Sequence, residues 1–222
     1  MGLNPSKGNM YDWVTHTWNT VKGECPHGCS YCYMHRWGKQ KPVRFDEKEL
    51  KTDLGKGNFI FVGSSCDMFA DDIPEEWIIE TLNHCFNFDN TYLFQTKNPN
   101  RIRNYLKHLP IKSKVCTTIE TNRIYSDIMQ NCPSPFNRAA YMHIFPLCGF
   151  ETFVTIEPIM DFDLRDMVDL ITVCNPEQVN IGADTGNNHL PEPPKVKILE
   201  LISELEKFTI VKQKPNLKRL LK

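Results

Sequence analysis

The sequence predicts an α/β fold in which a mostly parallel sheet is wound as a partial TIM-type (β/α)6 barrel. Short apolar runs of strand character alternate with amphipathic helical stretches along the chain, as in parallel strands joined by crossover helices. A complete barrel of eight such units needs ~250 residues, and this chain has 222. We therefore expect an incomplete barrel in a single domain over residues 1–222.

Each predicted strand is a short apolar or alternating run that ends in polar residues. The first, Trp13–Trp18, alternates in polarity. The second, Asn58–Gly63, is apolar enough for a strand buried on both faces. The remaining predicted strands, including a candidate seventh, are Tyr92–Gln95, Val115–Ile119, Thr152–Ile156, Gln178–Ile181 and Phe208–Val211.

Helices are predicted between these strands from the spacing of their apolar residues and from the residues at which they start. Pro74, with Glu75 and Glu76 in the first turn, opens a helix to about Phe86. The other predicted helices are a short polar one over 45–53, then Pro99–Leu109, Phe136–Phe145, 164–173 and Pro194–Lys207.

Three cysteines stand close together in a loop, 23–34, that follows the first predicted strand. Cys25, Cys29 and Cys32 are separated by three and then two residues, and Gly28 permits a tight turn that lets the thiols face one point. A four-iron, four-sulfur cluster held by three Cys ligands keeps one iron open for a small molecule. The alternative is a structural zinc site with His27 or His35 as fourth ligand, although no second C-x2-C or H-x3-H pair occurs.

In barrels, functional side chains lie at the C-terminal ends of the strands. Turn and cap formation explains some polar residues there, such as Asp67, Asn122 and Asp184. Turn and cap formation explains less well why long charged groups stand at the edge of a core. The candidate residues at the strand ends are Ser64, Ser65, Cys66, Asp67, Thr96, Lys97, Thr118, Glu120, Asn122, Glu157, Asp184 and Thr185.

The cysteine spacing, with Tyr31 before the last Cys, resembles the cluster loop of radical S-adenosylmethionine (SAM) enzymes. Over residues 13–215, the segments S-S-C-D, Q-T-K-N-P, T-I-E-T-N, T-I-E-P and I-G-A-D-T-G are similar to a small phage-associated branch close to the spore photoproduct lyases. The resemblance implies a radical SAM core, which is a partial barrel. It also implies an enzyme in which SAM binds a [4Fe-4S] cluster and is split by one electron, giving a deoxyadenosyl radical that abstracts hydrogen.

The resemblance further implies roles for the residues that would bind SAM. Ser65 and Asp67 would bind the SAM amino group, and Lys97 would approach its carboxylate. Thr118 and Glu120 would lie by the sulfonium and the ribose hydroxyls, which a carboxylate can accept. By the same resemblance, Tyr31 would lie near the adenine.

Two further residues have both a functional and a structural interpretation. Glu157 would contact cofactor or substrate, or else be a buried structural carboxylate paired with Lys97 or Arg138. Cys66 stands where the family tends to have Ser. Its thiol would donate a hydrogen atom to a product radical, or would simply be a small buried hydrophobe.

A net charge of -1 gives no overall attraction to nucleic acid, but two basic runs remain. Such runs are usually solvated faces. With an open barrel mouth, which suits a large substrate, the first run makes nucleic-acid repair or modification our leading substrate hypothesis. A peptide-modifying radical SAM enzyme and a zinc-stapled, non-catalytic interaction protein are the alternatives. The runs are His35, Arg36, Lys39, Lys41 and Arg44 around Trp37, and Lys212, Lys214, Lys218, Arg219 and Lys222 in a C-terminal tail over 212–222.

The remaining features predict a cytoplasmic protein. The chain has nine cysteines, and an odd number of cysteines fits a protein in a reducing compartment. No apolar run reaches the ~18 residues of a membrane span, and residues 1–20 lack a signal pattern. An electron donor such as a flavodoxin or ferredoxin is implied by the resemblance. The cysteines outside the triplet stand singly, with no second cluster motif: Cys66, Cys85, Cys116, Cys132, Cys148 and Cys174.

Overall fold

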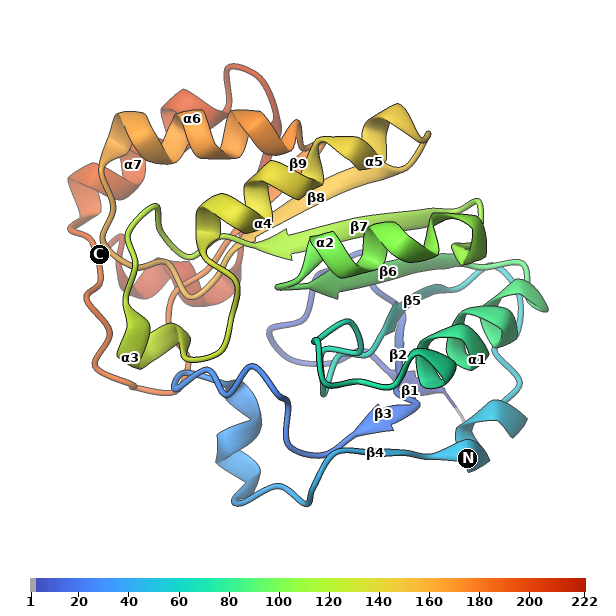
Figure 1. Ribbon diagram of the computed structural model, residues 1–222. Helices are drawn as coiled ribbons and strands as arrows, with labels where there is room; N and C mark the ends of the chain where they lie inside the picture. Colours follow the sequence, from blue (N-terminus) through green and yellow to red (C-terminus); the bar gives the residue numbers. More distant parts are fainter. Residues whose placement is uncertain (1–2) are drawn as a thin grey trace.

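An eight-stranded sheet forms the centre of the protein, in a computed structural model that describes residues 3–222 (Figure 1). Its strand order is β1-β2-β5-β6-β7-β8-β9-β10. β1 pairs antiparallel with β2, and every following neighbour pairs parallel. The strands are β1 Asn4–Pro5, β2 His16–Trp18, β5 Phe59–Val62, β6 Thr91–Thr96, β7 Ser113–Thr118, β8 Glu151–Ile156, β9 Gln178–Ile181 and β10 Ile210–Gln213.

The predicted α/β class with a mostly parallel sheet is confirmed, and its strand order is that of a partial barrel. β9 has the predicted bounds, and the candidate seventh strand forms as β10, two residues later than expected. The first strand is shorter than predicted, because Trp13 and Val14 precede β2 and pack in the interior of the sheet. A second, two-stranded sheet of β3 (Val21–Lys22) and β4 (Arg44–Phe45) was not predicted.

Most of the helices cover the outer face of the sheet (Figure 1). Two predicted helices are divided: the one from Pro99 continues as a 3-10 turn, and the one near residue 140 is broken in two. No helix within residues 3–222 is long and apolar enough to cross a membrane. The helices are α1 Glu75–Phe86, α2 Pro99–Ile102, α3 Ser126–Met129, α4 Pro135–Met142, α5 Ile144–Leu147, α6 Leu164–Cys174 and α7 Lys195–Leu205, with 3-10 segments η1 Tyr33–Trp37, η2 Glu47–Lys51, η3 Arg103–His108 and η4 Pro215–Arg219.

Side chains of alternate strand residues belong to two different apolar layers, as the two-residue period of a strand requires. One set packs with the helices in the large outer core and includes Ile60, Val62, Tyr92, Phe94, Val115 and Val154. The other set forms a small inner cluster, which the segment before β2 completes with Tyr11 and Val14. Its strand members are Phe61, Leu93, Cys116 and Phe153.

The inner apolar cluster forms the base of a cavity. Two residues farther along the same four strands, the equivalent positions are Gly63, Gln95, Thr118 and Thr155, and all four line this cavity. In three of these four strands, the inward position therefore changes from an apolar to a polar residue toward the C-terminal end. This change places the cavity at the end of the barrel where parallel α/β folds bind their ligands.

We expect Phe94→Ala to destabilise the protein by about 3–5 kcal/mol, because it leaves a cavity in the outer core. Phe94 is fully buried, whereas Phe86 at the end of α1 is 50% exposed and provides a matched control. Chemical denaturation would measure both variants, and we expect Phe86→Ala to change stability by only about 0.5 kcal/mol. Equal losses in the two variants would contradict the assignment of the outer core.

Candidate functional site

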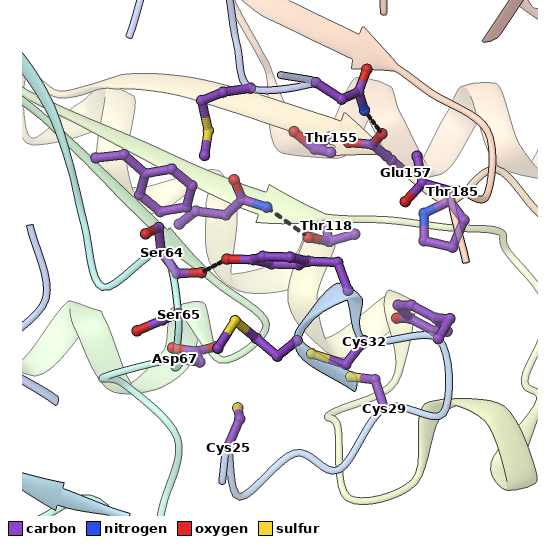
Figure 2. Close-up of a pocket in the computed structure, with 18 of the residues that line it drawn as sticks. Cys25, Cys29, Cys32, Ser64, Ser65, Asp67, Thr118, Thr155, Glu157 and Thr185 are labelled. Atoms are coloured by element: carbon purple, nitrogen blue, oxygen red, sulfur yellow. Dashed lines mark hydrogen bonds between the residues drawn. The ribbon is translucent and has the colours of Figure 1, made fainter. Parts of the chain in front are cut away.

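The cavity at the C-terminal ends of the strands has a volume of about 480 Å³ (Figure 2). The cysteine loop forms one wall, the ends of β5 to β9 form another, and residues near both chain ends, including Tyr11 and Lys214, complete it. The structure thus brings together most of the site residues predicted from the sequence. Those that line the cavity are Cys25, Cys29, Tyr31, Cys32, Ser64, Ser65, Cys66, Asp67, Thr96, Lys97, Thr118, Glu157, Asp184 and Thr185.

Two tight turns arrange the three thiols of the cysteine loop. Gly28 adopts a φ of +64°, which residues with a side chain rarely reach, and its N–H donates to the Cys25 carbonyl at 3.1 Å. The Cys32 N–H donates to the Cys29 carbonyl, also at 3.1 Å. In Figure 2 the sulfur of Cys25 and those of Cys29 and Cys32 face a shared space from two sides.

The short helix α3 and the residues after it hold this loop from behind. The Ser30 N–H donates to the Ile128 carbonyl at 3.0 Å, and the Asn131 N–H donates to the His27 carbonyl at 3.1 Å. These bonds also bring Cys132 to the loop, with its sulfur 3.3 Å from that of Cys29. This contact was not predicted from the sequence, because no spacing rule connects residues so far apart in the chain.

Two of the three thiols have a lowered pKa, which favours the thiolate, the form of cysteine that binds metals. A hydrogen bond with Cys66 lowers the pKa of Cys25 to about 7 against the effect of burial. A hydrogen bond with Cys132, and the charge of Lys97, lower the pKa of Cys29 to about 6. Burial raises the pKa of the Cys32 thiol.

An iron–sulfur cluster and a zinc ion require different arrangements of their donors. Within residues 3–222, no three His, Cys, Asp or Glu side chains gather closely enough to hold one metal ion. His27 directs Nε2 to Asp67 at 2.9 Å, and His35 is exposed. A four-iron cluster distributes its Cys ligands over separate irons, so three thiols around a shared space suit it.

Asp67 connects the cysteine loop to the strand ends. Its Oδ2 accepts hydrogen bonds from His27 Nε2 at 2.9 Å, from the Thr96 hydroxyl at 3.0 Å and from the Lys97 N–H at 2.8 Å. Burial favours a raised pKa for Asp67, but the hydrogen bond from His27 holds the pKa below its usual value. Asp67 therefore remains charged, although its oxygens are largely occupied by protein donors.

Glu120 lies behind the cavity wall and is not among the residues that line it. Its two oxygens pair with Arg138 Nη1 at 2.7 Å and Lys97 Nζ at 3.0 Å, and one also accepts the Tyr31 hydroxyl. Burial alone would raise the pKa of Glu120, but Arg138 and Lys97 lower it to about 2. This placement allows Glu120 to position Lys97, and its expected contact with ribose hydroxyls stays a prediction.

Lys97 extends from the end of β6 into the cavity wall. Its ammonium lies 5.2 Å from the centre of the Tyr31 ring and remains partly exposed. Burial would lower the pKa of Lys97, but the charge of Glu120 raises it well above its usual value. Lys97 therefore presents a permanent positive charge beside the thiols, suited to a carboxylate ligand.

Glu157 connects the two ends of the chain across the cavity. It forms an ion pair with Lys214 Nζ at 2.5 Å, and its Oε1 accepts from Asn9 Nδ2 and Asn216 Nδ2, both at 2.7 Å. The pairing with Lys97 or Arg138 considered from the sequence does not form, because both of those cations pair with Glu120. A side chain at Gly182 would place its Cβ 2.6 Å from Glu157 Oε1, so the Glu157 carboxylate would have to move.

A family model described as "Protein of unknown function (DUF5131)" matches residues 9–195 of this chain. No curated protein matches the sequence. The match covers most of the strands and the whole cysteine loop, so the site lies largely within the region that defines the family.

Several solved structures share the fold. A variant of spore photoproduct lyase superposes with a TM-score of 0.65 at 11% identity, covering 92% of this chain and 78% of the lyase. The lyase complexed with dinucleoside spore photoproduct gives 0.61 at 12% identity, over 90% and 64% of the two chains. Streptococcus suis SuiB bound to S-adenosylmethionine gives 0.57 at 10% identity, over 89% of this chain but only 49% of SuiB. The fold implied by the resemblance is thereby confirmed, and the phage-associated branch stays a prediction.

We expect Glu120→Gln to destabilise the protein by about 3–5 kcal/mol at pH 7, since it leaves the fully buried Arg138 and the partly buried Lys97 without their counter-charge. The folded-state pKa of Glu120 is about 2 against an ordinary value of 4.5. Its charge therefore stabilises the fold above pH 4.5, and this contribution is lost as the pH falls toward 2. Denaturation at several pH values should show a shallower acid dependence in Glu120→Gln than in the wild type. Glu206→Gln, at an exposed carboxylate, is the control, and equal acid dependence in all three proteins would contradict the role of Glu120.

Proposed function

Because the chain belongs to the DUF5131 family and shares its fold with spore photoproduct lyase and SuiB, we propose that it is a radical SAM enzyme. The observation that carries this proposal is the position of Cys25, Cys29 and Cys32 on the wall of a cavity that the strand ends also line. The same cavity thus offers thiolate ligands for a cluster and charged or polar groups for a small molecule.

Cys25, Cys29 and Cys32 would hold a [4Fe-4S] cluster. When bound and reduced, such a cluster supplies one electron that splits SAM into methionine and a deoxyadenosyl radical, which takes hydrogen from a substrate. A flavodoxin or ferredoxin is the electron donor that we propose. The nine free cysteines agree with a reducing, cytoplasmic location.

SAM would occupy the part of the cavity beside Lys97. The ammonium of Lys97 would bind the SAM carboxylate, held in place by Glu120. Ser65, Asp67 and Thr118 line the wall around it and would provide polar contacts to the amino group and the ribose. Tyr31 would offer its ring to the adenine, since its hydroxyl is already bound to Glu120.

Two residues would act on the substrate side of the cavity. Cys66 lines the wall and is nearly fully buried, as a thiol that donates a hydrogen atom to a product radical would be. Glu157 and Lys214 form an ion pair at the opposite wall. Their pairing leaves the region between them and the thiols as the space where substrate would enter.

The cluster assignment predicts that protein purified without oxygen is brown and binds about four irons per chain after reconstitution. With SAM and dithionite it should release deoxyadenosine. Cys29→Ala should bind less iron and lose this activity, because one ligand is missing, whereas Cys148→Ala, at an exposed cysteine, should retain both. Colourless protein with one zinc per chain, or equal turnover in wild type and Cys29→Ala, would overturn the proposal.

For the substrate we propose a nucleic acid, on the basis of an aromatic rim formed by Tyr33, Arg36 and Trp37 at the cavity mouth. The Arg36 guanidinium lies 4.3 Å from the centre of the Trp37 ring and 5.4 Å from that of Tyr33. Trp37 is 60% exposed. An exposed ring beside a cation suits a base and its phosphate, the pairing used by proteins that bind single strands.

The surroundings of the aromatic rim support the same substrate class. The predicted basic run is exposed at all of its basic residues, so it can approach a phosphate backbone: His35, Arg36, Lys39, Lys41 and Arg44. One similar structure is a spore photoproduct lyase complexed with dinucleoside spore photoproduct. Nucleic-acid repair or modification is therefore the reaction class that we propose.

We expect Trp37→Ala to weaken binding of single-stranded oligonucleotides about 5–100-fold, the usual loss of one stacking contact. Arg36→Ala should also flatten the dependence of affinity on salt. Fluorescence anisotropy over a range of salt concentrations would measure both effects. Arg103→Ala is a matched control, because Arg103 lies 5.2 Å from the centre of the Tyr141 ring, a cation–π pair outside the cavity.

The binding experiment also separates the nucleic-acid proposal from its main alternative. If the aromatic rim serves a peptide substrate, oligonucleotide binding should be weak and the same in wild type, Trp37→Ala and Arg103→Ala. That result would overturn the nucleic-acid proposal and leave the radical SAM assignment intact.

A further inference from the structure

A fourth cysteine, Cys132, contacts one of the three motif cysteines. Its sulfur lies 3.3 Å from that of Cys29, although the two residues are 103 positions apart in the sequence. This distance is within the range of a hydrogen bond between sulfur atoms and much longer than a disulfide bond. Cys132 itself is not among the residues that line the cavity, so it lies outside the space proposed for the substrate.

The backbone on both sides of Cys132 fixes its position. On one side, its N–H donates to the Met129 carbonyl at 3.2 Å, and the Asn131 N–H donates to the His27 carbonyl at 3.1 Å. On the other side, Arg138 Nε donates to the Pro133 carbonyl at 2.7 Å. The backbone of the segment that connects α3 to α4 thus sets the contact with Cys29. The contact is not a chance approach of two mobile side chains.

The chemistry of the site determines which sulfur carries the proton. A Cys that binds iron is a thiolate and has no hydrogen to donate. If Cys29 is a cluster ligand, its sulfur can only accept, and Cys132 must be the donor. The contact is then an S–H···S hydrogen bond directed at a ligand sulfur.

We propose that Cys132 is a positioning residue that tunes the cluster, by donating its S–H to Cys29 and so making the cluster easier to reduce. The inference rests on the proposed function, because it takes Cys29 to be a ligand. A hydrogen bond withdraws negative charge from the ligand sulfur and stabilises the more negative, reduced state. Hydrogen bonds to cluster sulfurs are among the factors that set the reduction potential.

The test compares Cys132→Ala, which removes the donor, with Cys132→Ser, whose hydroxyl can still donate. All proteins are full-length chains reconstituted without oxygen, and the midpoint potential is measured by a redox titration followed by electron paramagnetic resonance. We expect Cys132→Ala to have a more negative midpoint potential than wild type. Cys132→Ser should lie close to wild type, and both should keep the wild-type iron content.

Cys148→Ala is the control for loss of a cysteine elsewhere, because Cys148 is exposed, and its potential should match wild type. Equal potentials in wild type, Cys132→Ala and Cys132→Ser would overturn the inference alone. Loss of iron in Cys132→Ala would also overturn it, by showing that Cys132 is itself a ligand. A wild-type chain that binds no iron would overturn the proposed function together with the inference.

Discussion

The rest of the site depends on the interactions of one buried carboxylate, that of Glu120. It binds Arg138 of α4, Lys97 at the end of β6 and Tyr31 of the cysteine loop, so a single group fixes three separate elements. Burying an ion pair stabilises a fold little, but removing one partner is costly. We infer that the network positions these elements. It keeps Lys97 charged and fixes the distance between the cysteine loop and the strand ends.

The layered interior of the barrel explains why chemistry is concentrated at one end. Alternate residues of the strands face inward, and the inner cluster around Tyr11 and Phe153 fills the lower part of the barrel with apolar side chains. Two residues later, the same inward positions carry Gly63, Gln95, Thr118 and Thr155, which line the cavity above this apolar base. The segment before β2 thus fills the barrel interior below the cavity. Its side chains close the base of the site, so no separate domain is needed there.

Residues near the two ends of the chain complete the cavity through Glu157. Asn9 comes from the segment between β1 and β2, and Lys214 and Asn216 follow β10. This side of the cavity is therefore assembled only when the barrel is wound, and the thiols lie on the opposite wall. Cofactor and substrate would meet between a wall made by one continuous loop and a wall made by distant segments.

The sequence by itself determined the class of fold, the approximate strands and the cysteine loop, because these depend on local periodicity and on a compact motif. It also placed most of the cavity residues, since the C-terminal ends of parallel strands meet at one edge of a sheet. Only the tertiary structure decided which charges pair. Glu120 takes Lys97 and Arg138, Glu157 takes Lys214, and Cys132 reaches Cys29. Such partners lie far apart in the chain, and the winding of the barrel brings them together, so no spacing in the sequence records them.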